Sequence, residues 1–498
     1  MKNLIKVLGI VAIVAVIGFS MACGGGGDGG GGTGGGNKDL TGTITINLST
    51  GLTTELTATY SGKETVRFQW NKDGSNIGTF STTNPNKYTP TEEGSYTVTV
   101  SATGYNSKTS DAVTVILPEL SGTITVSPTT NVLAYTDLTA TYNGSEIVSY
   151  QWNKDGSNIG TATTTNPNKY TPTTKGSYTV TVSAAGYKSK TSTVVTVNAW
   201  ISIDSVFGKN GVYANAYGND KFVAVGSSGK MATSTDGTTW TTVTNSTFSN
   251  GINNSINAIT YGNDKFVAGS TDGKMATSTD GETWTAVSDS IFLNYSINAI
   301  AYGNDKFVAV GSSGKMATST DGTTWTAVTN STFPNNNIES INAITYGNDK
   351  FVAVGSSGKM ATSTDGTTWT AVTQSVFTSY IIAITYGNDK FVAVGSSGKM
   401  ATSTDGTTWT AVSNSTFDTS SINAIAFGNN MFVAGGDYGK MATSTDGETW
   451  TVVNIGNLFN FVDSTGSTHK ADIKVIAYGN NKFVAGGMMG KMAYFTDN

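Results

Sequence analysis

The chain has 498 residues, with 29 basic and 34 acidic side chains and only one histidine and one cysteine. A formal net charge of −5 provides no basic footprint, so we expect no nucleic-acid partner. A single histidine and a single cysteine cannot build a metal cluster, so we expect no metal and no cofactor. Sixty glycines with abundant Thr, Val, Tyr and Trp favour short strands joined by tight turns, which predicts an all-β protein.

The first 22 residues have the parts of a signal peptide. Lys2 and Lys6 precede a 13-residue apolar run, Val7 to Phe19, which is too short for a dedicated membrane span. Cys23 follows directly, and this arrangement resembles the lipobox of bacterial lipoproteins, although Ser20 stands where that family places an aliphatic residue. The resemblance implies that Cys23 receives diacylglycerol and becomes the mature amino terminus. Cleavage by ordinary signal peptidase, leaving a free thiol, is the alternative.

Residues 23–38 then form a glycine-rich stretch that has no apolar side chain to bury, which predicts a flexible tether. Together with Cys23, this predicts a protein that is held outside the cytoplasm by a lipid anchor, at the outer membrane or the cell surface. The membrane is then one partner, through the anchor.

Two similar modules follow, at residues 39–117 and 118–198. The segment FQWNKDGSNIGT from Phe68 recurs as YQWNKDGSNIGT from Tyr150, a period of 82 residues. Each module resembles an immunoglobulin-like β-sandwich. The resemblance implies that Trp70 and Trp152 are core tryptophans and that Tyr96 and Tyr178 are corner tyrosines, without the family's disulfide. We interpret both modules as spacers.

Residues 199–498 hold seven copies of a second repeat, spaced 40 to 51 residues apart. The signature Y-G-N-D-K-F, with small variations, begins each copy at Tyr217, Tyr261, Tyr302, Tyr346, Tyr386, Phe427 and Tyr478. A period near 40 with four β-prone runs per copy is typical of a propeller blade. The repeat therefore predicts a seven-bladed β-propeller.

Six copies carry a segment such as STDGTTW, Ser363 to Trp369, which resembles the Asp-box of sialidase-type BNR repeats with a turn one residue shorter. The resemblance implies a hairpin in which the aspartate accepts backbone N–H groups and the indole wedges between sheets. We expect this structural role for Asp236, Asp280, Asp321, Asp365, Asp405 and Asp446. The seventh copy ends before its tryptophan strand, whereas Trp200 to Ile203 has the missing pattern. We therefore predict that this early segment completes the last blade and closes the ring.

Catalysis is not expected. Sialidases bind their substrate carboxylate with three arginines, and residues 200–498 contain no arginine. The acids that are not repeated in every copy, Asp272, Asp289, Glu339, Asp418, Asp437 and Asp463, are scattered over several blades. A glycan-processing hydrolase of propeller type, using two such acids, is one alternative. An inert structural surface repeat protein is the other.

The most diversified part of the array is its last two blades. In place of the usual GSSGK turn, these blades have GDYGK and GMMGK, and a long loop from Asn454 to Asp472 joins them. Exposed aromatic and methionine side chains suit protein binding. We expect a non-catalytic protein that binds or scaffolds a protein or glycan partner through Tyr213, Asp437, Tyr438, Phe459, Phe461, His469, Lys474, Met488 and Met489. The alternative is that these differences are unselected drift at the closing seam.

Overall fold

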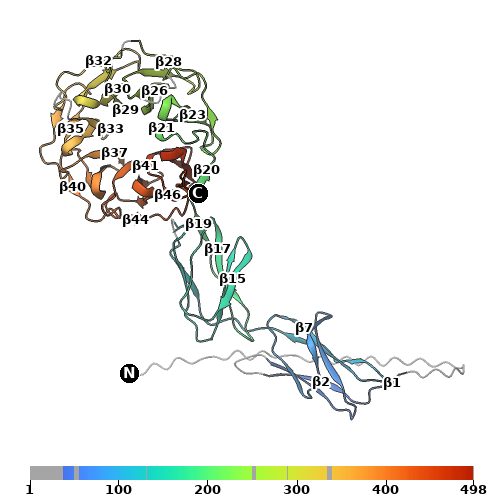
Figure 1. Ribbon diagram of the computed structural model, residues 1–498. Coiled ribbons are helices and arrows are strands. Elements are labelled where there is room, and N and C mark those ends of the chain that lie inside the picture. Colours follow the sequence, from blue (N-terminus) through green and yellow to red (C-terminus); the bar gives the residue numbers. More distant parts are fainter. Residues whose placement is uncertain are drawn as a thin grey trace, which may run out of the picture. The chain divides into compact units, whose positions relative to one another are not determined.

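The computed structural model describes residues 37–49, 55–129, 132–248, 254–288, 290–333 and 339–496 (Figure 1). Residues 1–22 and Cys23 lie outside the described residues, so the signal peptide and the lipidation stay predictions. The described part of the chain is all-β and contains short 3₁₀ turns but no α-helix. It also has no helix long and apolar enough to cross a membrane. The chain divides into two compact units, residues 1–118 with 185–187 and residues 119–184 with 188–498.

The first unit is built from two antiparallel sheets around one core. One sheet has the order β2 (Ile44–Ser49), β3 (Glu55–Tyr60), β6 (Asn86–Tyr88). The other has the order β10 (Val113–Val115), β7 (Gly94–Ser101), β4 (Arg67–Lys72), β5 (Ser75–Ser81), with β9 (Lys108–Thr109) beside β7. A short parallel pair joins β1 (Lys38–Asp39) to β8 (Tyr105–Asn106). Trp70 is buried between the sheets, and its indole Nε1 donates to Asn86 at 2.7 Å.

The second unit begins with a pair of sheets of the same kind. One has the order β11 (Ile124–Ser127), β13 (Leu138–Tyr142), β16 (Asn168–Tyr170). The other has the order β12 (Val132–Leu133), β19 (Val195–Asn198), β17 (Gly176–Ser183), β14 (Ser149–Lys154), β15 (Ser157–Thr163), with β18 (Lys190–Thr191) beside β17. Trp152 donates to Asn168 at 2.7 Å, so the repeated sequence repeats the hydrogen bond of the first pair.

Seven four-stranded sheets complete the second unit, counted over the described residues. We number them by their first strand in the chain and call the contact between successive sheets a junction. Sheet one is β21 (Val212–Gly218), β22 (Lys221–Gly226), β23 (Met231–Ser234), β24 (Thr241–Thr242), and sheet two is β25 (Ile256–Gly262), β26 (Lys265–Ser270), β27 (Met275–Ser278), β28 (Thr285–Ala286). Sheet three is β29 (Ile297–Gly303), β30 (Lys306–Gly311), β31 (Met316–Ser319), β32 (Thr326–Ala327), and sheet four is β33 (Ile341–Gly347), β34 (Lys350–Gly355), β35 (Met360–Ser363), β36 (Thr370–Ala371).

The remaining sheets follow the same plan. Sheet five is β37 (Ile381–Gly387), β38 (Lys390–Gly395), β39 (Met400–Ser403), β40 (Thr410–Ala411), and sheet six is β41 (Ile422–Gly428), β42 (Met431–Gly436), β43 (Met441–Ser444), β44 (Thr451–Val452). Sheet seven is β47 (Ile473–Gly479), β48 (Lys482–Gly487), β49 (Met492–Thr496), with β20 (Ile201–Ile203) as its fourth strand. The first strand of each sheet contacts that of the next, and β47 of sheet seven contacts β21 of sheet one (Figure 1).

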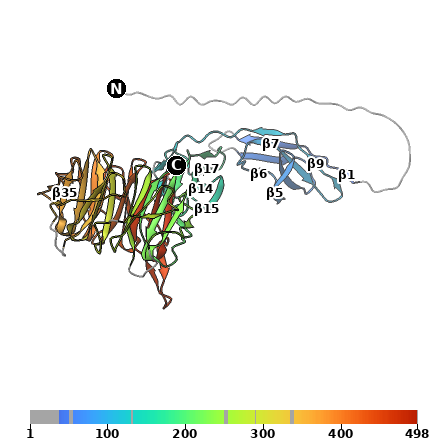
Figure 2. The ribbon, with the colours of Figure 1, turned by 90° about the horizontal axis from the view of Figure 1, so that it is seen from above.

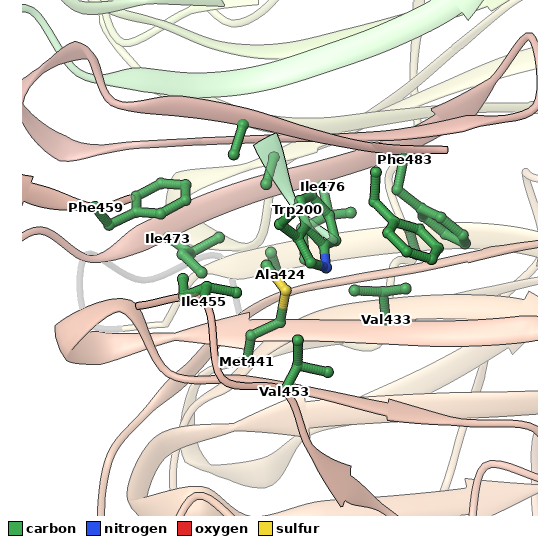
Figure 3. Close-up of a cluster of buried hydrophobic side chains, with 14 of the residues drawn as sticks. Trp200, Ala424, Val433, Met441, Val453, Ile455, Phe459, Ile473, Ile476 and Phe483 are labelled. Carbon is green, nitrogen blue, oxygen red and sulfur yellow. The ribbon is translucent and has the colours of Figure 1, made fainter. Parts of the chain in front are cut away.

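The last sheet is assembled from both ends of this array. Strand β20 pairs antiparallel with β49, with Ile201 opposite Tyr494 and Ile203 opposite Met492. Trp200 is only 7% exposed, and its ring lies 5.7 Å from that of Phe495. Figure 3 shows Trp200 among apolar side chains of sheets six and seven. The early segment therefore takes the place of the fourth strand that the seventh repeat lacks.

The hairpin turns explain the repeated Asn-Asp and Gly residues. Asn348 and Asp349, between β33 and β34, have φ of 45° and 55°, which these two residue types tolerate. The turns from second to third strands are 3₁₀ turns in six sheets: η1 (Ser227–Gly229), η2 (Ser312–Gly314), η3 (Ser356–Gly358), η4 (Ser396–Gly398), η5 (Asp437–Gly439) and η6 (Met488–Gly490). A separate two-stranded hairpin, β45 (Asn460–Val462) and β46 (Thr468–Lys470), lies between sheets six and seven.

Candidate binding surface

One face of the ring gathers the diversified segments. Because neighbouring strands are antiparallel, the turns from second to third strands emerge on the same face as the connections from one sheet to the next. We call this the turn face. Tyr438 lies in η5 and Met488 and Met489 lie in η6, while Tyr213 and Lys474 lie near the start of the first strands of sheets one and seven. The β45–β46 hairpin also belongs to this face, and Figure 2 shows an orange-red hairpin standing out from the ring.

Two of these residues have a strained backbone. The middle residue of all six 3₁₀ turns lies in the left-handed region, with φ between 56° and 58°. That residue is serine in four sheets, but it is Tyr438 in sheet six and Met489 in sheet seven. A bulky side chain in this conformation costs about 1 kcal/mol. Tyr438 is also 64% exposed, so its packing does not compensate for the strain.

Asp472 connects the turns of sheets six and seven. Its Oδ1 accepts the backbone N–H of Tyr438 at 3.0 Å, and its Oδ2 lies 3.1 Å from Lys474 Nζ. Its backbone oxygen accepts the N–H of Met488 at 3.0 Å. One carboxylate and one carbonyl thus bring together three of the residues that the sequence predicted. Asp472 itself was not among the predicted residues.

The β45–β46 hairpin lies beside η5 and carries two further predicted residues. The rings of Phe461 and His469 are 5.5 Å apart, and His469 Nε2 lies 2.7 Å from Asp463 Oδ2. Asp463 Oδ1 also accepts the N–H groups of Thr465 and Ser467 within the turn. The Thr465 hydroxyl and His469 hold the pKa of the Asp463 carboxyl well below its usual value. The histidine therefore binds the carboxylate that shapes the hairpin.

Phe459 and Asp437, which the sequence predicted to contact a partner, instead make contacts that hold the fold together. Phe459 is only 2% exposed and packs in the cluster at the junction of sheets six and seven, so the expectation of an exposed aromatic was wrong for this residue. It is buried because the long loop folds back before the hairpin begins, and Ala471 N–H donates to its carbonyl at 2.8 Å. Asp437 accepts the N–H of Ser421 at 3.1 Å and the Asn423 amide at 2.9 Å, so its carboxylate anchors the turn. Tyr213 is half-buried, on the strand that contacts η6.

Three further unrepeated acids are paired with nearby lysines. Asp272 lies 2.8 Å from Lys274, and Glu339 lies 2.6 Å from Lys359. Asp418 likewise lies 2.9 Å from Lys440, and Asp289 lies outside the described residues. Over the residues that the structure describes, no group of three His, Cys, Asp or Glu side chains is placed to hold a metal ion.

The six repeated aspartates organise the turns that hold the tryptophans. Asp365 Oδ1 accepts the N–H groups of Thr367 and Thr368, both at 2.7 Å, and the Ser363 hydroxyl at 3.0 Å. The N–H groups outweigh the effect of burial and lower the pKa of the Asp365 carboxyl. The same arrangement lowers the pKa of Asp280 to about 2. Trp369 is 6% exposed and donates to the Gly366 carbonyl at 3.0 Å.

The Y-G-N-D-K-F signature binds the aspartate turn of the next sheet. Asn304 of sheet three donates to the Thr364 carbonyl of sheet four at 3.2 Å, and Lys306 donates to the Asp365 carbonyl at 2.8 Å. Asn480 of sheet seven reaches Thr235 of sheet one in the same way. Sheet six has Met431 in place of the lysine, and Asp497, which stands at the place of the turn aspartate in sheet seven, lies outside the described residues.

One family model and several solved structures are similar to part of this chain. A family model described as the DUF6242 beta propeller domain matches residues 244–356. The solved structure "YCF48 bound to D1 peptide" is 17% identical, with a TM-score of 0.48, covering 60% of this chain and 96% of its own. "YCF48 from Cyanidioschyzon merolae" is 18% identical, with a TM-score of 0.45, covering 60% of this chain and 98% of its own.

The WD40 beta propeller domain of Doa1 is 10% identical, with a TM-score of 0.46, covering 60% of this chain and 96% of its own. A comparison with curated proteins finds no match. The family match falls on residues whose strands form four-stranded sheets around a ring. The chain therefore contains a β-propeller domain.

Proposed function

We propose that this protein is a non-catalytic binding or scaffolding protein that recognises a protein or glycan partner through the turn face of sheets six, seven and one. The observation that carries the proposal is Tyr438, a large side chain that is exposed and strained where four other sheets have serine. Backbone strain that packing does not compensate is typical of functional positions. Tyrosine and methionine are also residue types that protein-binding surfaces favour.

The surrounding contacts support a preorganised surface. Asp472 ties Tyr438 to Lys474 through its carboxylate and to Met488 through its carbonyl. A surface whose loops are fixed before binding loses less entropy when a partner binds. The surface that we propose comprises Tyr213, Tyr438, Phe461, His469, Lys474, Met488 and Met489. A propeller fold is compatible with such a role.

We propose that the seven sheets are the blades of a closed propeller with Asp-box turns, and that the two preceding pairs of sheets are immunoglobulin-like spacers. The Trp70 and Trp152 hydrogen bonds and the tyrosine-to-backbone bonds of Tyr96 and Tyr178 support the second assignment. We further propose a lipid anchor at Cys23, which places the protein at the cell envelope. Its support is the sequence pattern of residues 1–23.

We propose that the propeller has no hydrolase activity. The absence of arginine from residue 200 onward and the lysine pairing of Asp272, Glu339 and Asp418 support this view. The repeated aspartates are engaged by backbone N–H groups, which keeps them ionised and unsuited to donate a proton. Turnover of a glycan by the full chain would overturn this proposal.

The binding proposal is tested by restoring the common turn. The variant Asp437→Ser, Tyr438→Ser, Met488→Ser, Met489→Ser gives sheets six and seven the turn of sheets one, three, four and five. Crosslinked partners from envelope extracts and signals on a glycan array are compared between this variant and the unaltered chain. We expect partners of the unaltered chain to be lost. A control variant, Ser356→Asp with Ser357→Tyr, changes the turn of sheet four and should keep them. If the variant with the restored turns keeps the same crosslinked partners and glycan signals as the unaltered chain, this surface is not the binding surface.

A further inference from the structure

The junction between sheets seven and one is less apolar than the other six. In sheets two to seven, the first strand presents two buried isoleucines to the preceding sheet, such as Ile256 and Ile259. In sheet one, Val212 and Asn215 stand at these two positions. Asn215 is only 9% exposed, so a polar side chain replaces an isoleucine inside a packed junction.

Asn215 is only partly satisfied at this place. Its Nδ2 donates to the backbone carbonyl of Val484 in sheet seven at 3.0 Å. Its Oδ1 has no hydrogen-bond partner among the described residues. A buried acceptor without a partner loses its hydrogen bonds to water and gains none in return, which destabilises the folded state. Native packing alone therefore favours isoleucine, and the asparagine needs another explanation.

The order of synthesis distinguishes this face from the others. The isoleucine face of each later sheet meets a sheet that has already been made. The corresponding face of sheet one waits for sheet seven, whose first strand begins only at Ile473. During that time an isoleucine face would fit other copies of the chain, because the second strand of every sheet presents valine at the place of Val484. Partly folded chains with exposed apolar faces associate readily.

We infer that Asn215 keeps the open face of sheet one from pairing with a second copy of the chain until the ring closes, at some loss of native stability. Terminal repeats of open repeat arrays need polar outer faces for the same reason. In this ring the terminal face carries a polar side chain, Asn215, although the face ends up buried. Val212, smaller than isoleucine, reduces the same apolar surface.

The test is Asn215→Ile in the full chain. We expect a higher urea midpoint of unfolding and, after cell-free synthesis, a yield of soluble monomer lower by about twofold or more that falls further when the chain is made at higher concentration. Light scattering and size-exclusion chromatography measure the yield. The control is Asn257→Ile, which adds the same side chain at a half-buried position where sheet five already has Ile382. It should give the same yield of soluble monomer as the unaltered chain.

The two expected changes have opposite signs, which a purely structural role would not produce. Asn215→Val serves as a second variant in case isoleucine does not fit beside sheet seven. Lower stability of both variants would show that Asn215 acts through its bond to Val484, and the inference would be wrong. An unchanged yield of monomer would also refute it.

Discussion

Replacing Trp200 with alanine tests how the ring closes. Trp200 is 7% exposed, stacks on Phe495 at 5.7 Å and lies among Met441 and Val453 of sheet six. Truncating a buried aromatic side chain costs about 3–5 kcal/mol, from lost burial and the cavity that remains. We therefore expect Trp200→Ala to lower the free energy of unfolding of the propeller by about that amount.

The position of Trp200 adds a second expected effect. Strand β20 has three residues and is joined to sheet one by the connection 204–211, so loss of the indole should let it detach. Urea unfolding followed by circular dichroism measures the stability, and limited proteolysis measures cleavage within 204–211. Trp369→Ala, which removes an indole of similar burial from sheet four, should cost a similar free energy without this cleavage. Val452→Ala, at a 63% exposed position, controls for surface changes. A loss below about 1 kcal/mol for Trp200→Ala would refute this account of closure.

Three further predictions concern the contacts between sheets and the binding surface. Lys350→Met should lower the free energy of unfolding by about 1–2 kcal/mol, because Lys350 donates to the Asp405 carbonyl at 2.8 Å. Urea midpoints of the variant and the unaltered chain measure the loss, and equal midpoints would contradict the prediction. The carboxyls of the aspartate turns have lower pKa values in the folded state than in the unfolded state, and the folded-state pKa of Asp280 is about 2. These carboxylates therefore stabilise the fold above the unfolded-state pKa of about 4, and that stabilisation is lost as the pH falls towards 2. Thermal melts between pH 5 and pH 2 measure this loss, and we expect the Tm to fall steadily over that range. A Tm that does not change with pH would contradict the prediction. Tyr438→Asn should raise the free energy of unfolding by about 0.5–1 kcal/mol, because asparagine tolerates the left-handed conformation. The same variant should weaken partner binding. A lower free energy of unfolding would show instead that the tyrosine supports the fold.

The repeat made much of the array predictable. Because Y-G-N-D-K-F and the aspartate turn recur with a constant pattern, the order of strands within a sheet could be inferred, and the missing tryptophan strand pointed to Trp200. Contacts between sheets were harder to infer, since the partner of Lys306 lies 59 residues later. A comparison of the seven repeats could still have revealed Met431 and Asn215, which break the pattern at single positions.

The candidate surface was predictable only in outline. The divergent turns identified Tyr438 and Met488, but the loop between sheets six and seven has no repeat to compare. Its first part folds inward and buries Phe459, while its second part forms the hairpin with His469. Asp472 was missed because its role depends on three contacts made across two sheets. An alignment of the copies would have marked it as the only acid at the position before a first strand.

The shared last sheet also determines how the propeller would carry tension. Strand β19 ends at Asn198 and β20 begins at Ile201, so the backbone enters the ring at its closing strand. A pull transmitted along the chain from the preceding modules reaches the three residue pairs of β20 and β49 before it reaches any complete sheet. The mechanical resistance of the whole ring is then set first by Trp200 and these few hydrogen bonds.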